Sequence, residues 1–230
     1  MDILPWSEST AALNMARDLL LLESYPDPRV PRFRAYGWSE AAFTFGVSQR
    51  WADYRAKVPA SSTLVRRATG GGLVSHLEDW TFALALPAGH PATELEALES
   101  YAIVLRALGV ALRAQGQPVS MAPAPSGARG FSAPTVCAER AEPHDLVHAD
   151  GRKVAGAAQK RTRDGLLLEG YVWKPFLPGL DLVRLARDFP DALADALGTS
   201  ARPVAEPAYE KAAASAAAER FGSSAWNERL

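Results

Sequence analysis

A glycine-rich segment between two arginines and a histidine is the first part of the sequence that points to chemistry. Its distinctive residues are Arg66, Arg67, Thr69, Gly70, Gly71, Gly72 and His76. Glycines let a backbone pass close to a ligand with its N–H groups aimed at it, and arginines supply forked donors for phosphate or carboxylate. The histidine adds a group that changes charge near neutral pH. The pattern predicts a ligand-binding loop, and a glycine-rich surface turn with solvated arginines is the alternative.

A lysine followed by small residues forms the second group. In an extended strand, one face carries Lys153, Ala155, Ala157 and Gln159, and the other carries Val154, Gly156 and Ala158. Such small residues fill a core poorly, but they suit the wall of a narrow slot in which an extended chain lies against the backbone. A lysine at the mouth of this slot would donate to a carbonyl oxygen and stabilise negative charge developing there. A solvated surface lysine just past a turn is the alternative.

The single cysteine, Cys137, can form neither an internal disulfide nor a multi-cysteine metal site, and we expect no metal ligands. It is therefore either a small buried hydrophobe or a reactive thiol. It lies within residues 118–143, which are rich in proline, alanine, serine and glycine. This composition predicts a mobile or ligand-covering loop.

The overall composition limits the classes of function. The 230 residues are 48% hydrophobic and 22% charged, and the formal net charge is −1. These values are typical of a folded chain with a substantial core, and they argue against a general nucleic-acid or membrane-surface binder. Apolar runs stay shorter than the roughly 18 residues of a membrane helix, and the start of the chain lacks the layout of a signal peptide. We therefore expect a cytoplasmic protein.

Helices and strands are predicted from apolar spacing and from the residues that bound each segment. The predicted helices span residues 8–24, 49–57, 92–115, 180–197 and 207–221. The predicted strands span residues 32–38, 42–46, 63–67, 80–86, 145–148, 153–159 and 166–173. The last three strands form a meander, because Asp150-Gly151 and Asp164-Gly165 are typical hairpin turns. We expect one domain over residues 1–230, with a helical C-terminal segment at 180–230.

These residues resemble the lipoate–protein ligase and octanoyltransferase family, relatives of the biotin ligases. The two main matching segments are Arg66-Arg67-Ala68-Thr69-Gly70-Gly71-Gly72 through His76, and Gly151-Arg152-Lys153-Val154-Ala155-Gly156-Ala157-Ala158-Gln159. Further matching positions are Asn14-Met15-Ala16, Arg34, Tyr36, Trp38, Phe45-Gly46, Gln49 and Thr81-Phe82. The resemblance covers most of residues 6–175, and the Gly-Arg-Gly-Arg loop of biotin ligases is absent. The sequence departs from the family at Ala157, commonly serine, and at Leu168-Glu169, often Gln-His.

The resemblance implies an α+β domain with the biotin/lipoate ligase catalytic-domain fold, which is similar to class II aminoacyl-tRNA synthetases. A mixed, mainly antiparallel sheet would be flanked by helices, and the glycine loop and lysine strand would enclose a tunnel for an octanoyl or lipoyl group. By similarity, Lys153 would contact the acyl carbonyl and His76 would lie at the rim. The phosphate or carrier-arm side would be lined by Arg66, Arg67, Thr69, Gly70, Gly71 and Gly72, and the tunnel wall by Gly156, Ala157 and Ala158.

Three functions stay open on this resemblance. A transferase would move the acyl group from a carrier to Cys137 as a thioester and then to an acceptor lysine, and Cys137 stands where one transferase branch has its nucleophile. Nearby basic residues such as Arg152 would lower the pKa of this thiol, whereas Glu139 and Glu142 oppose its ionisation. The second function is an ATP-dependent lipoate–protein ligase that forms lipoyl-AMP. The third is a non-catalytic module that binds an acyl group or lipoyl domains.

The resemblance also implies partners and cofactors. The transferase would use acyl carrier protein as donor and lipoyl-domain or glycine-cleavage H-type proteins as acceptors, without a cofactor. The ligase would need ATP and Mg. Residues 174–230 are too few for a standard accessory domain, so the length favours the transferase, or a ligase whose accessory domain is a separate chain. Neither nucleic acid nor membrane is an expected partner.

Overall fold

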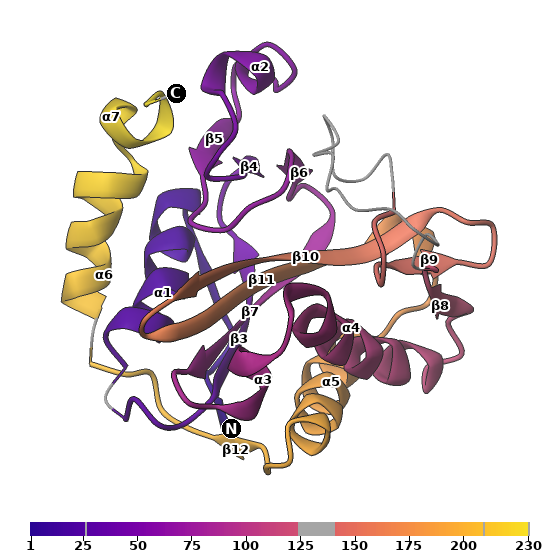
Figure 1. Cartoon of the computed structure of the whole chain (residues 1–230). Coiled ribbons are helices and arrows are strands. Elements are labelled where there is room, and N and C mark those ends of the chain that lie inside the picture. The colour runs from indigo at the N-terminus through magenta and orange to yellow at the C-terminus, as the bar shows by residue number, and fades with distance from the viewer. Residues whose placement is uncertain (26, 124–140, 209, 230) are drawn as a thin grey trace.

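A nine-stranded mixed sheet lies at the centre of the computed structural model, which describes residues 1–25, 27–123, 141–208 and 210–229 (Figure 1). The strand order is β12-β1-β3-β7-β11-β10-β9-β8, and β2 pairs with β3. The strands are β1 (Asp2–Ile3), β2 (Ser7–Ser9), β3 (Arg32–Trp38), β7 (Asp79–Pro87), β8 (Val119–Met121), β9 (Leu146–His148), β10 (Lys153–Thr162), β11 (Gly165–Trp173) and β12 (Arg202–Pro203). The pairs from β3 through β8 are antiparallel, whereas β1, β2 and β12 pair in parallel.

Helices cover both faces of this sheet (Figure 1). α1 (Ala11–Glu23) lies on one face, with α6 (Glu210–Ala216) and the π-helical turn η2 (Ala217–Phe221) packed outside it. α4 (Ala97–Arg113) and α5 (Leu182–Ala196) lie on the other face. The shorter helices are α2 (Trp51–Arg55), α3 (Pro91–Glu94), η1 (Lys174–Phe176) and α7 (Ser224–Asn227). The arrangement confirms the predicted α+β fold, and within the described ranges no helix is long and apolar enough to cross a bilayer.

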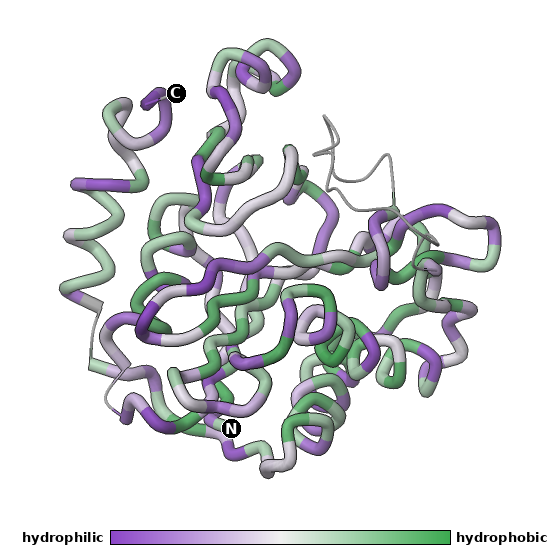
Figure 2. The backbone as a smooth tube through the Cα atoms, in the orientation of Figure 1, coloured by the Kyte–Doolittle hydropathy of each residue, from purple (hydrophilic) through white to green (hydrophobic). Residues whose placement is uncertain are grey.

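Alternation along β7 explains how the two faces differ. Phe82 and Leu84 join the apolar core under α4 and α5, whereas Ala83 and Ala85 point toward α1. The alanines let α1 approach the sheet closely, so that polar side chains of this helix reach the strands. Figure 2 shows the apolar residues gathered in the central strands, while β10 becomes hydrophilic toward its end.

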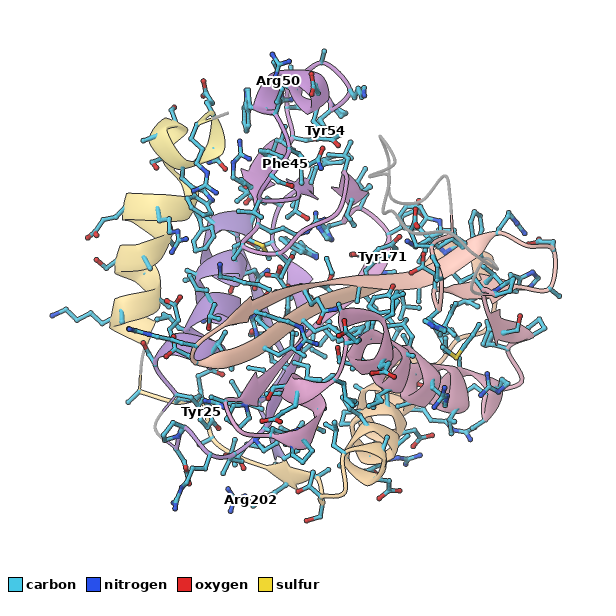
Figure 3. The ribbon with its side chains drawn as sticks, in the orientation of Figure 1. Tyr25, Phe45, Arg50, Tyr54, Tyr171 and Arg202 are labelled. Carbon is cyan, nitrogen blue, oxygen red and sulfur yellow. The ribbon has the colours of Figure 1, made fainter. Side chains whose placement is uncertain are left out.

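A three-stranded sheet, β5-β4-β6, carries the glycine-rich segment. Its strands are β4 (Ala42–Phe45), β5 (Thr63–Arg66) and β6 (Val74–Ser75). Phe45 packs with Tyr54 of α2 in an apolar cluster of its own, and both residues are labelled in Figure 3. Because β5 leads into the glycine-rich segment and β6 follows it, both ends of that segment are fixed by this sheet.

The structure differs from the prediction at one helix and at several short strands. The helix expected over 92–115 is divided, because Glu96 caps α4 in a reciprocal capping box with Glu99. Leu95 and Leu98 prolong the apolar spacing in the sequence, but both side chains are exposed. The short strands β1, β2, β6, β8 and β12 were not predicted, since two or three residues carry no readable period.

The predicted meander is present as β9, β10 and β11. Gly151 and Gly165 have φ values of 87° and 131°, a region that glycine adopts without strain. In the β10–β11 pair, Gly156 lies opposite Tyr171 and Ala158 lies opposite Glu169. This register decides which side chains of the hairpin share one face.

Gly46, directly after β4, lies where the glycine-rich segment passes. A Cβ at this position would lie 2.7 Å from the carbonyl carbon of Gly70 and closer still to the carbonyl oxygen of Gly71. The segment is held there by a hydrogen bond of 2.8 Å from the Val47 N–H to the Thr69 carbonyl. Only a residue without a side chain fits between the strand end and this backbone.

We expect Gly46→Ala to lower the free energy of unfolding by about 2 kcal/mol, because the atoms that the new methyl group meets belong to the backbone and cannot rotate away. Thermal denaturation measures the effect. Gly70→Ala is the matched control, since no atom lies within 4 Å of a Cβ built there. Equal losses of stability in the two variants would contradict the close contact at Gly46.

Candidate active site

A cavity that opens to solvent lies among α1, the small sheet and the β10–β11 hairpin. Its walls are Met15, Tyr36, Thr44, Arg67, Gly71, Val74, His76, Thr81, Lys153, Ala157, Ala158, Glu169, Gly170 and Tyr171. Tyr171, labelled in Figure 3, marks the wall that the hairpin provides. The two segments singled out in the sequence, the glycine-rich loop and the lysine strand, therefore meet at one cavity.

The predicted site residues divide into three groups. Those that line the cavity are Arg67, Gly71, His76, Lys153, Ala157 and Ala158. Those that are not among the lining residues are Arg66, Thr69, Gly70, Gly72 and Gly156. Cys137 lies outside the described residues. The structure thus brings both motifs together at the cavity, but several residues of these motifs do not line it.

Lys153 enters the site from the first position of β10. Its side chain is buried, and its Nζ lies 2.7 Å from Oδ2 of Asp145. A Cβ at Gly156 would lie 2.7 Å from this Nζ and 2.8 Å from Oδ1 of Asp145. Gly156 therefore leaves the space in which the ion pair lies, which explains its place in the motif better than contact with a ligand does.

Asp145 was not predicted as a site residue, yet it is completely buried beside the lysine. It accepts a hydrogen bond from the Tyr101 hydroxyl and another, of 2.6 Å, from the Glu142 N–H. The Tyr101 hydroxyl in turn accepts from the Ala157 N–H at 2.9 Å. A buried charge is tolerated where its partners are complete, and these contacts complete them for Asp145.

Burial and the neighbouring Asp145 raise the pKa of Tyr101 well above its ordinary value, so the hydroxyl keeps its proton and stays a donor. Tyr101 lies on the sheet-facing side of α4, where it interrupts an otherwise apolar stripe. A tyrosine within an apolar stripe is the feature of the sequence that could have indicated a buried polar contact here. Its partner could not be identified without the fold.

Arg67 supports the glycine-rich loop from within. Its Nε donates to the Gly70 carbonyl at 3.0 Å, and its Nη2 donates to the Gly72 carbonyl at 3.0 Å. Its Nη1 reaches the Thr44 hydroxyl at 3.3 Å. The guanidinium lines the cavity while these donors hold the loop carbonyls, so its first role in the structure is to shape the loop.

Arg66 points the other way, which corrects the prediction that it lines the ligand side. The side chain is fully buried and donates to the carbonyls of Trp226 at 3.0 Å and Asn227 at 2.7 Å. Its Nη1 also donates to the carbonyls of Val47 and Gln49. The physical reason is strand alternation, since consecutive residues of β5 and its extension face opposite sides. Arg66 therefore binds the C-terminal segment.

His76 has hydrogen-bond partners at both ring nitrogens. Nδ1 lies 2.6 Å from Oδ2 of Asp79, and Nε2 lies 2.8 Å from the Thr44 hydroxyl. The ring stacks on Trp38 with centroids 4.0 Å apart. A neutral ring that donates from Nδ1 and accepts at Nε2 satisfies both contacts. His76 thus forms part of the cavity wall and joins β6 to β7.

The arrangement suits chemistry at a carbonyl group. A buried ammonium faces a cavity whose β10 wall consists of alanines, and low polarity strengthens its attraction for a developing oxyanion. Within the part of the chain that the structure describes, no cluster of three or more His, Cys, Asp or Glu side chains could hold a metal ion. The described residues therefore supply electrostatic stabilisation and an apolar slot.

Comparison with known proteins gives matches of sequence and fold. Residues 10–174 match the family described as Lipoyl protein ligase A/B catalytic domain. Octanoyltransferase LipM of Kyrpidia tusciae is 28% identical over 96% of this chain and 86% of its own length. Octanoyltransferase LipM of Moorella thermoacetica is 31% identical over 68% of this chain, which spans 58% of that relative.

Among solved structures, a putative lipoate protein ligase from T. acidophilum with bound lipoic acid superposes with a TM-score of 0.78. It is 17% identical, and the match covers 99% of this chain and 98% of the other. This likeness establishes that the two chains share a fold.

Removing the partner of a buried charge tests the ion pair. We expect Asp145→Asn to lower the free energy of unfolding by about 3 to 5 kcal/mol, because Lys153 then remains charged and uncompensated. The double variant Asp145→Asn/Lys153→Met should recover most of this loss, since no buried charge is left. Urea denaturation of the three proteins measures both effects. A double variant as unstable as the single one would show that the cost has another origin.

Proposed function

Because this chain belongs to the lipoyl protein ligase A/B catalytic-domain family, we propose that it is an acyltransferase of protein lipoylation. It moves an octanoyl group from a carrier thioester through Cys137 to a lysine of a lipoyl-domain acceptor. The octanoyltransferase relatives support octanoyl transfer. The observation that carries the proposal is the buried Lys153 ammonium, which faces a cavity with a wall of small residues.

The proposed reaction has two acyl transfers. The Cys137 thiolate attacks the carbonyl carbon of the carrier thioester, and the carrier thiolate leaves. The acceptor amine then attacks the Cys137 thioester, loses its proton, and the Cys137 thiolate leaves as the amide forms. Negative charge develops on the carbonyl oxygen in both steps, and Lys153 is the residue we assign to stabilise it. Thioester exchange in the first step is nearly isoenergetic, and amide formation makes the second step favourable.

Lys153 has the right chemistry for this role. Its ammonium is an N–H donor that lines the cavity, and its Nζ lies 2.7 Å from Oδ2 of Asp145. The ion pair fixes the side chain in place, so that little reorganisation accompanies the reaction. In this proposal, Asp145 and Tyr101 are positioning residues, since they act on the substrate only through the lysine.

The small-residue wall supports binding of an aliphatic chain. Ala157 and Ala158 line the cavity from β10, and Gly170 lines it from β11. The methylene groups of an octanoyl tail buried here would contribute about 5 kcal/mol in total, at roughly 0.8 kcal/mol for each group. Burial of apolar surface would favour the binding of an octanoyl group and of a lipoyl group alike.

The proposed partners follow from the reaction. Acyl carrier protein is the proposed donor, and lipoyl-domain or glycine-cleavage H-type proteins are the proposed acceptors. The alternative activity is an ATP-dependent lipoate–protein ligase that works with a separate accessory chain. The structural likeness to the T. acidophilum protein with bound lipoic acid is the reason that the experiment below also tests this alternative.

Incubation with octanoyl-acyl carrier protein tests the proposal. We expect mass spectrometry to detect an octanoyl adduct on Cys137, and Cys137→Ser to lose both the thioester and acceptor modification. Addition of a lipoyl-domain acceptor to the wild-type protein should discharge the thioester. Acceptor modification that needs ATP and free lipoate, with no adduct on Cys137, would replace the transferase with the ligase.

Replacement of the cavity lysine tests its role in both steps. We expect Lys153→Met to reduce the rate of acyl transfer by about 100-fold or more, the size of effect seen when one oxyanion-stabilising group is removed. Lys211→Met is the matched control, because Lys211 lies exposed on α6. Transfer at the wild-type rate in Lys153→Met would refute the assignment.

A further inference from the structure

Two carboxyl groups from different elements lie next to the inner wall of the cavity. Asp18 is completely buried on α1, and Glu169 on β11 is 7% exposed and lines the cavity. Glu169 lies opposite Ala158 on one neighbouring strand and opposite Ala83 on the other. Glu169 therefore lies between alanines of the two neighbouring strands, on the sheet that α1 covers.

Asp18 forms a buried ion pair with Arg34. Arg34 on β3 donates from Nη1 to Oδ1 of Asp18 at 2.6 Å and from Nη2 to Oδ1 of Asn14 at 2.9 Å. The Tyr36 hydroxyl donates to Oδ2 of Asp18 at 2.6 Å. Asp18 thus has the partners that a buried carboxylate requires.

Glu169 has a different environment. Its Oε2 accepts a hydrogen bond from the Thr69 hydroxyl, while no N–H or hydroxyl group of a described residue donates to its buried Oε1. The carboxyl group of Asp18 is close enough to share a hydrogen bond with Glu169, which requires a proton on one of the two. Arg67 is the cation on the loop side, but its donors are directed to loop carbonyls and to Thr44. No ion pair with Glu169 is found in the described part of the chain. If Asp18 and Glu169 were both ionised, the guanidinium of Arg34, which is hydrogen-bonded to Asp18, would have to compensate two negative charges.

We propose that Glu169 is an uncharged carboxylic acid when the acyl group binds, and that its proton is what keeps the inner wall of the cavity apolar enough for the chain. This inference rests on the proposed function, since it takes the cavity to be the acyl site. Loss of the proton would place an unpaired charge against the hydrocarbon chain. Glu169 is in this sense a specificity-determining residue for an apolar acyl tail.

The titration of the pair agrees with the geometry. Burial first, and the negative charge of Asp18 second, raise the pKa of Glu169 to about 8, and the Thr69 hydroxyl and Arg67 oppose this rise without cancelling it. The other polar groups that face the pair are Asn14, Arg34 and Tyr36, and burial raises the pKa of Tyr36 further from neutrality. Burial also raises the pKa of Asp18, and Arg34 and Tyr36 oppose that rise. Because Asp18 has these two donors and Glu169 has no ion pair among the described residues, Glu169 is the member of the pair that holds the proton.

Binding of octanamide by the full chain tests the inference. This probe carries the acyl chain and carbonyl oxygen, does not titrate and cannot be transferred. We expect its dissociation constant, measured by calorimetry, to rise about tenfold or more between pH 7 and pH 9.5, as the neutral form of Glu169 is depleted. In Glu169→Gln the side chain has the same shape but no titratable group, so the dissociation constant of octanamide for this variant should stay constant over this range. Glu78→Gln, at an exposed carboxylate, should keep the wild-type profile.

A second readout needs no ligand. The folded protein keeps this proton up to about pH 8, whereas the unfolded chain releases it near the ordinary value of 4.5. Raising the pH between these values therefore favours the unfolded chain, and wild type should lose more thermal stability from pH 6.5 to pH 9 than Glu169→Gln does.

The outcomes separate this inference from the proposed function. A constant dissociation constant for wild type, or an unchanged alkaline rise in Glu169→Gln, would overturn the inference. Octanamide binding that depends on pH as expected would support it even if no thioester forms on Cys137. Absence of octanamide binding at every pH would overturn both the acyl cavity and the inference.

Discussion

The buried ion pair between Lys153 and Asp145 is the constraint around which the site is arranged. Two charges removed from water are favourable only when their other hydrogen bonds are complete, and Tyr101 and the Glu142 N–H complete them for Asp145. The pair also needs space, which Gly156 leaves by having no side chain. The small residues of β10 thus leave room for the charges, and in the proposed function the same residues admit an aliphatic chain.

The glycine-rich loop owes its shape to the two arginines that precede it. Arg67 binds the loop carbonyls from the cavity side, and Arg66 binds the C-terminal segment on the other side. A loop with three glycines has high conformational entropy when it is free, so such fixation is needed before it can form a cavity wall. The arginine pair is therefore first a structural device, and any contact with a ligand depends on it.

Much of the fold and the location of the site were predictable from the sequence, for reasons that particular residues make clear. The Asp-Gly turns define the meander locally, and the lysine with its small neighbours and the glycine-rich loop identify the cavity walls. Asp145 and Tyr101 were missed because their roles arise only when α4 packs on β10. The role of Arg66 was misjudged because its partners lie in the C-terminal helix, where no local pattern marks them. Short edge strands and the break at Glu96 likewise depend on tertiary contacts.

The link between Arg66 and the residues of α7 has a consequence for the order of folding. Its hydrogen bonds join positions 160 and 161 residues apart in the chain, so forming them closes a very large loop. Contacts of this sequence separation carry a high entropic cost and slow the folding of the parts that depend on them. The β10–β11 hairpin, whose partners are adjacent in the chain, can form early. We therefore expect the two walls of the cavity to form at different times, with the glycine-rich wall completed last.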